Sequence, residues 1–382
     1  MRKEMRNFFT IIFFALASTG CITPFEPAGV ASGESIVVIE GNIIQNDTSR
    51  VVVSRTVDLN EQNSIAYVSN AQVWVESESG EKYNGIGVKE GNKTEYRINT
   101  VGIDPSKRYK LCVVADFSLY ESDYVPVLNT PEIDSIGYYV HPDNRNVTFY
   151  VNTHDPQNST RFYKWNYHED WEFHSMYRSV WEYDPVKDSV RNIPWEQNRY
   201  NCWQKAVSSS ILVESTENLS QDVVHQKKLT TIGENDKRVN YLYSIELTQM
   251  AISKEAYIYW ENMRKNSDNI GGLFSPQPSE ITGNIHNTNN LQQRVIGYVS
   301  AARVSKKRVY ANAVDIGIYK WPTTCETIII DNINNIPFKT LHEMDYDIIN
   351  HDDAIIWASR RCVDCRLFGT KNKPLFWPSA NI

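Results

Sequence analysis

Residues 108–115 read RYKLCVVA, a short apolar run preceded by the turn residues Asp104 and Pro105. Tyr109, Leu111 and Val113 occupy alternate positions, which predicts a β-strand with these side chains on one buried face. A tyrosine soon after such a turn is similar to the tyrosine corner of immunoglobulin-like domains. Cys112 lies three positions after this tyrosine and therefore points to the opposite face. We predict that Cys112 is a buried free thiol and that no disulfide joins two sheets at this point.

The segments before this run follow the same pattern of short strands and turns. Residues 71–76 alternate apolar and polar side chains, and residues 78–81 form a turn signal after them. Further strands are expected at residues 36–41, 50–56 and 95–98, with a turn cluster at residues 46–49. Such a series is typical of a sandwich, so we predict an immunoglobulin-like or transthyretin-like β-sandwich over residues 36–128.

The pattern changes near residue 129, and residues 129–382 are predicted to form a larger β-rich domain. Strands are expected at residues 147–151, 162–167, 241–247 and 294–301. One helix is expected at residues 254–267, because Ser253 is a good N-cap and Glu255 lies in the first turn. The fold class is therefore mainly β with a minor α component.

The N-terminal residues have the order of a secretory leader. Three basic residues, Arg2, Lys3 and Arg6, precede an apolar run at residues 8–17, and small residues lead to Cys21. We expect a signal peptide over residues 1–20 and a lipid anchor, including palmitate, on Cys21, followed by a tether over residues 21–35. The alternative is an ordinary secreted protein with a free thiol at that position.

Charge and cysteine usage limit the remaining possibilities. The net charge is −7, and no clustered basic face is visible, so no nucleic-acid partner is expected. Four further cysteines, Cys202, Cys325, Cys362 and Cys365, could form two disulfides in an exported chain, and the sequence leaves three pairings open. Cys362 and Cys365 form a C-x-x-C pattern, which we interpret as structural rather than as a redox or zinc motif.

The chain is rich in aromatic residues between residues 163 and 203. Aromatic rings can stack on a glycan or a peptide ligand, or they can fill a β core. The candidates for ligand stacking are Trp165, Tyr167, Trp171, Trp181 and Trp195. We expect some rings of this tract to reach the surface, because the number of tryptophans exceeds what a simple core requires.

No catalytic motif is recognisable in the sequence. Nucleophile-elbow, zinc-protease, phosphate-loop and dinucleotide patterns are missing. Two groups, one around His168 and His174 and one around His351, contain histidine and carboxylate side chains that can bind metals. Neither group has a recognised spacing of metal ligands. We therefore expect no catalytic residue, no metal and no cofactor.

Several fragments in the same order resemble the Bacteroidota lipoproteins of the domain of unknown function family DUF4249. They include residues 39–41, 54–56, 70–73, 163–165, 257–260, 278–285 and 295–298, and the tail from Cys362 to Trp377. The resemblance implies an outer-membrane lipoprotein, often encoded beside a TonB-dependent receptor, with no established activity.

Three hypotheses follow for the function. The first is a non-enzymatic binding or accessory lipoprotein of a TonB-dependent nutrient uptake system, on either face of the outer membrane. The first alternative is a structural or assembly adaptor of the cell envelope, and the second is an unrecognised hydrolase.

Overall fold

A computed structural model describes residues 35–57, 65–268, 281–317, 325–330, 336–352 and 354–378. The leader, Cys21 and most of the predicted tether lie outside the described residues. About half of the chain is β-strand, arranged in several sheets that include a curled half-barrel, so the prediction of a mainly β fold is confirmed. No helix among the described residues is long and apolar enough to cross a membrane.

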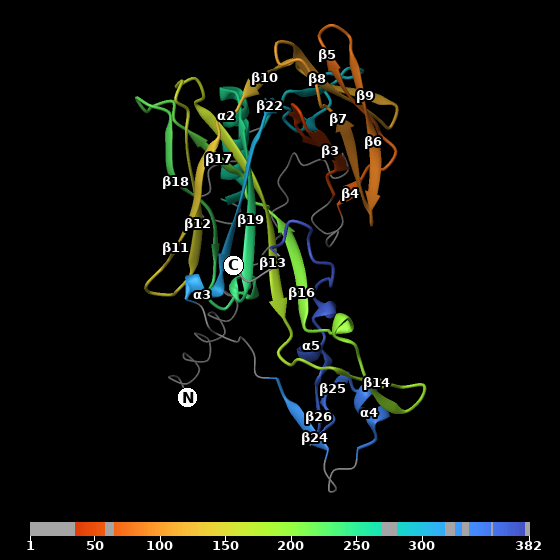
Figure 1. The fold of residues 1–382 in the computed structure, drawn as a ribbon. Helices are drawn as coiled ribbons and strands as arrows, with labels where there is room; N and C mark the ends of the chain where they lie inside the picture. The colour runs from red at the N-terminus through yellow and green to blue at the C-terminus, as the bar shows by residue number, and fades with distance from the viewer. Residues whose placement is uncertain are drawn as a thin grey trace, which may run out of the picture. The chain divides into compact units, whose positions relative to one another are not determined.

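The first sheet is built from the N-terminal strands (Figure 1). They are β1 (Val37–Gly41), β2 (Ile43–Ile44), β3 (Thr48–Arg55), β4 (Ala66–Tyr67), β5 (Gln72–Ser77), β6 (Lys82–Glu90), β7 (Lys93–Asn99), β8 (Arg108–Ala115), β9 (Ser118–Ser122) and β10 (Val125–Asn129). The order β10-β8-β5-β6-β7-β3-β1 is antiparallel at every pairing. The alternating residues of these strands form one apolar core that contains Val53, Val73, Ile98 and Leu111.

Strand β8 behaves as its sequence predicts. Tyr109 is fully buried, and its hydroxyl donates a hydrogen bond to the Asp104 carbonyl oxygen at 3.0 Å. Cys112 is also fully buried and is a free thiol. The predictions of a free Cys112 and of no disulfide from it are both confirmed.

Three short strands from the later chain join this first sheet. They are β20 (Ile285–Asn287), which pairs with β9, β21 (Val295–Ile296), which pairs with β1, and β22 (Ala301–Arg303), which pairs with β10 and β2. The single strand predicted over residues 294–301 is therefore wrong: β21 ends at Ile296. Gly297 has a φ of 152° and lies so close to β1 that an added Cβ would be 2.3 Å from the Ile39 carbonyl oxygen. The domain boundary near residue 128 stays a prediction.

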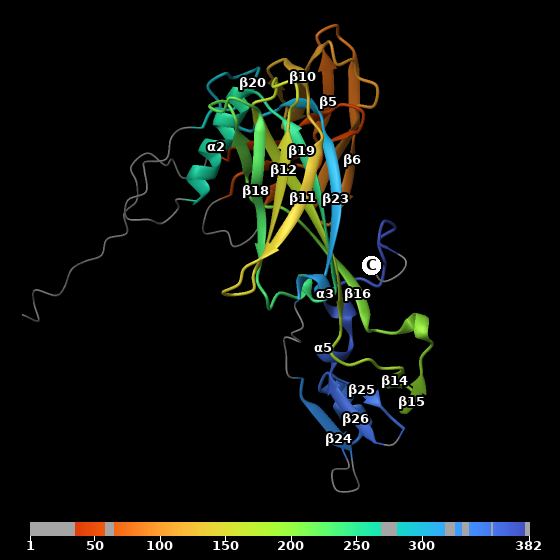
Figure 2. The same ribbon diagram turned by 60° about the vertical axis from the view of Figure 1, so that its left-hand side comes forward.

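A second group of strands forms two further sheets (Figure 2). One contains β11 (Ile133–Val140), β12 (Val147–His154) and β18 (Val223–Ile232). The other contains β16 (Asn201–Val207), β13 (Phe162–His174), β17 (Leu212–Ser215), β19 (Leu242–Ala251) and β23 (Ser305–Asn312). Strand β13 runs well beyond the predicted residues 162–167, because its odd-numbered aromatic residues continue to face one core.

Helix α2 (Lys254–Asp268) confirms the predicted helix and its cap, since the Ser253 hydroxyl accepts a hydrogen bond from the Ala256 N–H at 3.2 Å. A shorter helix, α3 (Ala313–Ile316), follows β23, and the 3-10 turn η2 (Lys237–Val239) precedes β19.

The remaining elements form what we call the C-terminal lobe, which has its own core of Tyr183, Leu341, Ile348 and Trp357. Its strands are β14 (Trp181–Asp184), β15 (Ser189–Asn192), β24 (Thr327–Ile330), β25 (Tyr346–Asn350) and β26 (Ile355–Ser359). Its helical turns are η1 (Trp195–Gln197), α4 (Phe338–Glu343), α5 (Arg360–Val363) and η3 (Cys365–Leu367).

Candidate ligand-binding site

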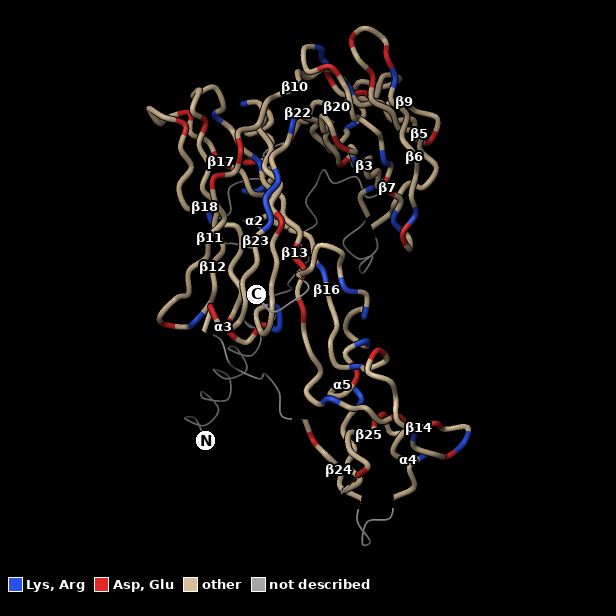
Figure 3. Tube along the Cα trace, viewed as in Figure 1, with Lys and Arg blue, Asp and Glu red and all other residues tan. Residues whose placement is uncertain are grey.

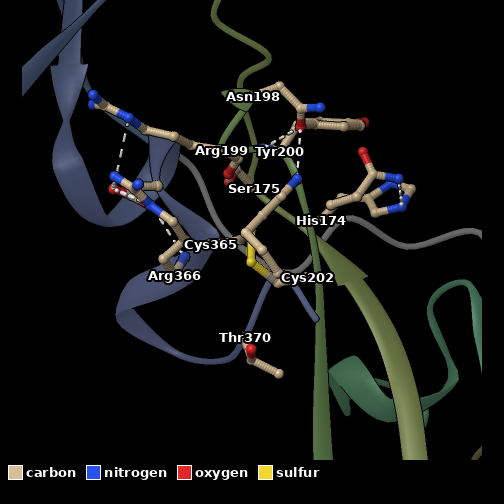
Figure 4. The surroundings of a disulfide bond; sticks show 12 residues. His174, Ser175, Asn198, Arg199, Tyr200, Cys202, Cys365, Arg366 and Thr370 are labelled. Carbon is tan, nitrogen blue, oxygen red and sulfur yellow. Dashed lines mark hydrogen bonds and ion pairs between the residues drawn. A yellow bond between two sulfur atoms is a disulfide. The ribbon is translucent and has the colours of Figure 1, made fainter. Parts of the chain in front are cut away.

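Two disulfides involve the C-terminal lobe. One joins the lobe to the sheet that contains β13 and β16, and the other lies within the C-terminal part of the chain. Cys202 of β16 bonds to Cys365 of η3, and Cys325 bonds to Cys362 of α5. All four predicted cysteines are therefore paired, but the two cysteines of the C-x-x-C pattern do not bond to each other. Figure 4 shows the first bond, with His174 on one side of it and Arg366 on the other.

Backbone hydrogen bonds hold the C-terminal segment beside the first disulfide. The Cys365 N–H donates to the Arg199 carbonyl oxygen at 2.9 Å, and Trp203 and Thr370 exchange bonds of 2.8 and 2.9 Å. The tail thus continues along the edge of β16. This attachment is consistent with the structural role that was predicted for Cys362 and Cys365.

A cavity of about 520 Å³ lies beside both disulfides. We call it the disulfide pocket, and its lining consists of Phe173, His174, Ser175, Met176, Lys237, Asn240, Tyr241, Cys325, Ser359, Arg361, Cys362, Cys365 and Phe368. The lining comes from the end of β13, from η2 and the residues before β19, and from α5 and η3. Three aromatic rings and three disulfide-bonded cysteines make much of this wall apolar. Six polar side chains interrupt it, those of His174, Ser175, Lys237, Asn240, Ser359 and Arg361.

His174 is the most constrained polar side chain of the pocket. Its Nε2 lies 2.8 Å from a carboxylate oxygen of Glu172, and its ring packs against Tyr241 and Tyr200 at centroid distances of 3.4 and 4.6 Å. Burial raises the pKa of Glu172, but the hydrogen bonds from His174 and other donors outweigh it and hold this pKa below its usual range. The carboxylate therefore fixes the imidazole ring in place.

The other ring nitrogen of His174 has no partner. The side chain is only 10% exposed, and Nδ1 is buried without a hydrogen bond. The same holds for Asn240 Oδ1 in the same lining. A buried polar atom without a partner costs roughly 1–3 kcal/mol, so a ligand that satisfied these two atoms would recover part of that energy.

Two cations stand at the same cavity. Lys237 Nζ lies 4.9 Å from the ring centroid of Phe173 and 5.6 Å from that of Phe368, and Arg361 Cζ lies 5.5 Å from that of Phe368. Neither forms an ion pair with a carboxylate within the described part of the chain. Lys237 is half-buried, and this burial lowers its pKa below that of a free lysine, whereas Arg361 is exposed at the rim.

A neighbouring cavity, also about 520 Å³, has a different character. It is lined by what we call the charged cluster, which includes Glu182, Arg199, Asp347, Arg360, Asp364 and Arg366. Basic and acidic positions lie close together in this part of the chain (Figure 3). Arg199 pairs with Asp347 at 3.2 Å, and Arg366 pairs with Asp364 at 2.7 Å. Because its charges are satisfied internally, we interpret the charged cluster as structural.

The aromatic residues predicted for ligand stacking do not converge on one surface. Trp165, Tyr167 and Trp171 are at most 5% exposed and belong to one apolar core. The prediction that these three rings stack on a ligand is therefore wrong, and they pack in the core instead. Strand β13 has neighbouring strands on both edges and turns these rings inward. The Trp165 indole N–H donates to the Gln249 side-chain oxygen at 2.8 Å, which satisfies its polar atom inside the core.

The other two tryptophans lie nearer to solvent. Trp181 is half-buried in the C-terminal lobe and packs beside His351 at a centroid distance of 5.4 Å. Trp195 is 47% exposed, and the Arg178 guanidinium lies 3.9 Å from its ring. Only these two retain access for a ligand.

Sequence reasoning missed most of the disulfide pocket. His174 was noted only as part of a weak metal pattern, and no group of three or more metal-ligating side chains occurs among the residues that the structure describes. Lys237, Asn240 and Arg361 carried no local signal. The one useful clue was the cysteine pair, because side chains next to disulfide-bonded cysteines are brought together from distant parts of the chain.

The comparisons with known proteins give a family but no activity. The family model described as "Domain of unknown function (DUF4249)" matches residues 22–308. No curated protein matches the chain. Among solved structures, a DUF4785 family protein from Legionella pneumophila is similar at 8% identity with a TM-score of 0.17, over 56% of this chain and 52% of that protein. That likeness spans only about half of the solved protein and carries no argument. The family match covers most of the sequence, and the chain belongs to the DUF4249 family.

Proposed function

We propose that this chain is a lipid-anchored outer-membrane protein that binds a ligand without catalysis and helps a TonB-dependent receptor to take up a nutrient. The disulfide pocket is the observation that carries the proposal. Its volume of about 520 Å³ lies in the usual range of small-molecule sites, roughly 300–1,000 Å³. Such sites combine an apolar wall with a few polar groups, as this one does.

The proposed location rests on three features of the chain. Residues 1–20 have the order of an export leader, and Cys21 stands where a lipid would be attached. Disulfides persist in oxidising compartments, so the two found here support a place outside the cytoplasm. The family resemblance supports an origin in Bacteroidota and the receptor as partner.

The finer architecture is also a proposal. The hydrogen bond from Tyr109 to the Asp104 carbonyl oxygen supports an immunoglobulin-like relationship for the N-terminal sheet. In that arrangement the sheet acts as a scaffold. Trp181 and Trp195 are then candidates for contacts with a larger glycan or peptide.

The direct test is co-purification from native membranes. Full-length protein with an affinity tag is solubilised in mild detergent, and the proteins that accompany it are identified by mass spectrometry. A second lipoprotein with the same tag controls for non-specific capture. We expect one TonB-dependent receptor in stoichiometric amount with the tagged chain and not with the control.

Recovery of the chain alone, after cross-linking as well as without it, would contradict the receptor partnership. Recovery with envelope assembly proteins would instead favour an adaptor role.

A further inference from the structure

We infer that the disulfide pocket takes a small amphipathic carboxylate: an apolar or aromatic body with one anionic group and one N–H or O–H donor. This inference rests on the proposed binding function and names the class of ligand for the same site. Three independent features of the lining select the three parts of such a molecule.

The apolar body is selected by the aromatic wall. Phe173, Tyr241 and Phe368 line the cavity together with Cys325, Cys362 and Cys365 of the two disulfides. Rings and sulfur atoms offer contact area without hydrogen bonds, so an apolar or aromatic group is the part of a ligand that loses least water here. A fully hydroxylated sugar would leave its polar groups unsatisfied against this wall.

The anionic group is selected by Lys237 and Arg361. Both line the pocket, and neither has a carboxylate within ion-pair distance among the described residues, although Asp236 acts on Lys237 at longer range. The charged cluster provides a contrast within the same lobe, because its arginines Arg199 and Arg366 each have an acidic partner. Two cations left without acidic partners beside a half-buried cavity match a carboxylate that arrives with the ligand.

The hydrogen-bond donor is selected by the two unpartnered atoms. The tautomer that donates from His174 Nε2 to the Glu172 carboxylate leaves Nδ1 as an acceptor, and Asn201 Nδ2 lies 3.0 Å from the same Nε2. Asn240 Oδ1 is a second buried acceptor in the same lining. A ligand N–H or O–H that reached either atom would satisfy it.

The test uses full-length protein in phosphatidylcholine nanodiscs and isothermal titration, with empty nanodiscs to subtract partition into lipid. The probes are indole-3-acetate, 1-naphthaleneacetate and decanoate, each beside its neutral amide, and acetate alone. Indole-3-acetate carries all three selected parts, 1-naphthaleneacetate lacks the N–H, and acetate lacks the body. We expect one-to-one binding of indole-3-acetate, at least about tenfold tighter than its amide and tighter than the naphthalene analogue.

The variants Lys237→Gln and Arg361→Gln should each weaken binding of the anion by about tenfold and weaken binding of the amide by much less. Asn240→Ala should reduce the preference for indole over naphthalene. These side chains have no carboxylate or hydrogen-bond partner in the described protein, so the variants should fold normally. Lys228→Gln is the matched control, because Lys228 is exposed on β18 and outside the pocket.

Equal affinity for acids and amides would overturn the inference. An equal loss of affinity for the anion in Lys228→Gln and Lys237→Gln would overturn it as well. So would failure of every probe to bind. None of these results depends on the co-purification of a receptor. A wrong ligand class and a wrong proposed function can therefore be distinguished.

Discussion

At the scale of single residues, burial separates side chains of the same type. Trp165 is fully buried and hydrogen-bonded, whereas Trp195 is about half exposed. The alternation of Tyr163, Trp165 and Tyr167 was a sound strand signal, and it also meant that these rings share one face. That shared face is the core, which is why the period-2 pattern argued for packing more strongly than for ligand contact.

The two tryptophans should therefore respond differently to truncation. Trp165→Ala leaves a large cavity and should lower the free energy of unfolding by about 3–5 kcal/mol. Trp195→Ala removes an exposed ring and should change it by about 0.5 kcal/mol or less. Guanidinium unfolding curves of both variants measure the difference. Similar losses in the two would show that the assignment of Trp165 to the core is wrong.

The buried thiol of Cys112 should be chemically silent. Burial, reinforced by the nearby Glu121 carboxylate, raises the pKa of Cys112 to about 12. The thiolate, which is the reactive form, is therefore almost absent at pH 8. We expect no labelling by iodoacetamide in the native protein and one labelled site after denaturation without reductant. Rapid native labelling would contradict the burial of this residue.

At the scale of elements, the local sequence pattern predicted the strands but not which distant segments of the chain lie next to each other. The strands at β8 and β13 and the helix α2 were visible from periodicity and capping. The pocket was not visible, because His174, Lys237 and Arg361 meet only when the chain after β23 returns to the edge of β16. The four cysteines indicated that distant segments are joined, but their spacing leaves three pairings open, so the sequence did not show which side chains meet.

Each disulfide should stabilise the attachment of the C-terminal lobe. Replacing Cys202 and Cys365 together by alanine should lower the free energy of unfolding by about 2–5 kcal/mol. The matched control replaces Cys325 and Cys362, which are 37 residues apart instead of 163, and should cost about 1 kcal/mol less on loop entropy. Denaturant midpoints without reductant provide the comparison. A larger loss in the control pair would contradict this ranking.

The loop after β12 should depend on pH through Asp155. Burial alone would raise the pKa of Asp155, but hydrogen bonds from Ser159, Thr160 and Gln157 lower it to about 2. A lowered pKa means that the stabilisation is present above the ordinary value near 3.8 and is lost as pH falls toward 2.

The variant Asp155→Ala should therefore be about 1–2 kcal/mol less stable than the native chain at pH 7. The part of the difference that depends on the charge should shrink below pH 4 and be lost below pH 2. Urea unfolding across this range measures it, and a difference independent of pH would exclude a role for the charge.

At the scale of the whole molecule, the chain combines a proposed membrane anchor with a covalently attached lobe. The proposed attachment to the membrane is a lipid on Cys21. Two acyl chains bind a membrane strongly, since each buried methylene contributes about 0.8 kcal/mol.

Cys21→Ser should therefore move the protein from the membrane fraction to the soluble periplasmic or external fraction and abolish incorporation of labelled palmitate. Cys112→Ser is the control and should do neither. Palmitate labelling that persisted in Cys21→Ser would place the lipid elsewhere.

The bond between Cys202 and Cys365 has one more consequence, which concerns cleavage of the chain by proteases. Any single cut between residues 203 and 364 leaves two fragments that this bond still holds together. A nicked molecule would migrate as one chain without reductant and as two chains with it. Damage to an exposed loop in that interval therefore does not by itself release the lobe that forms one wall of the pocket.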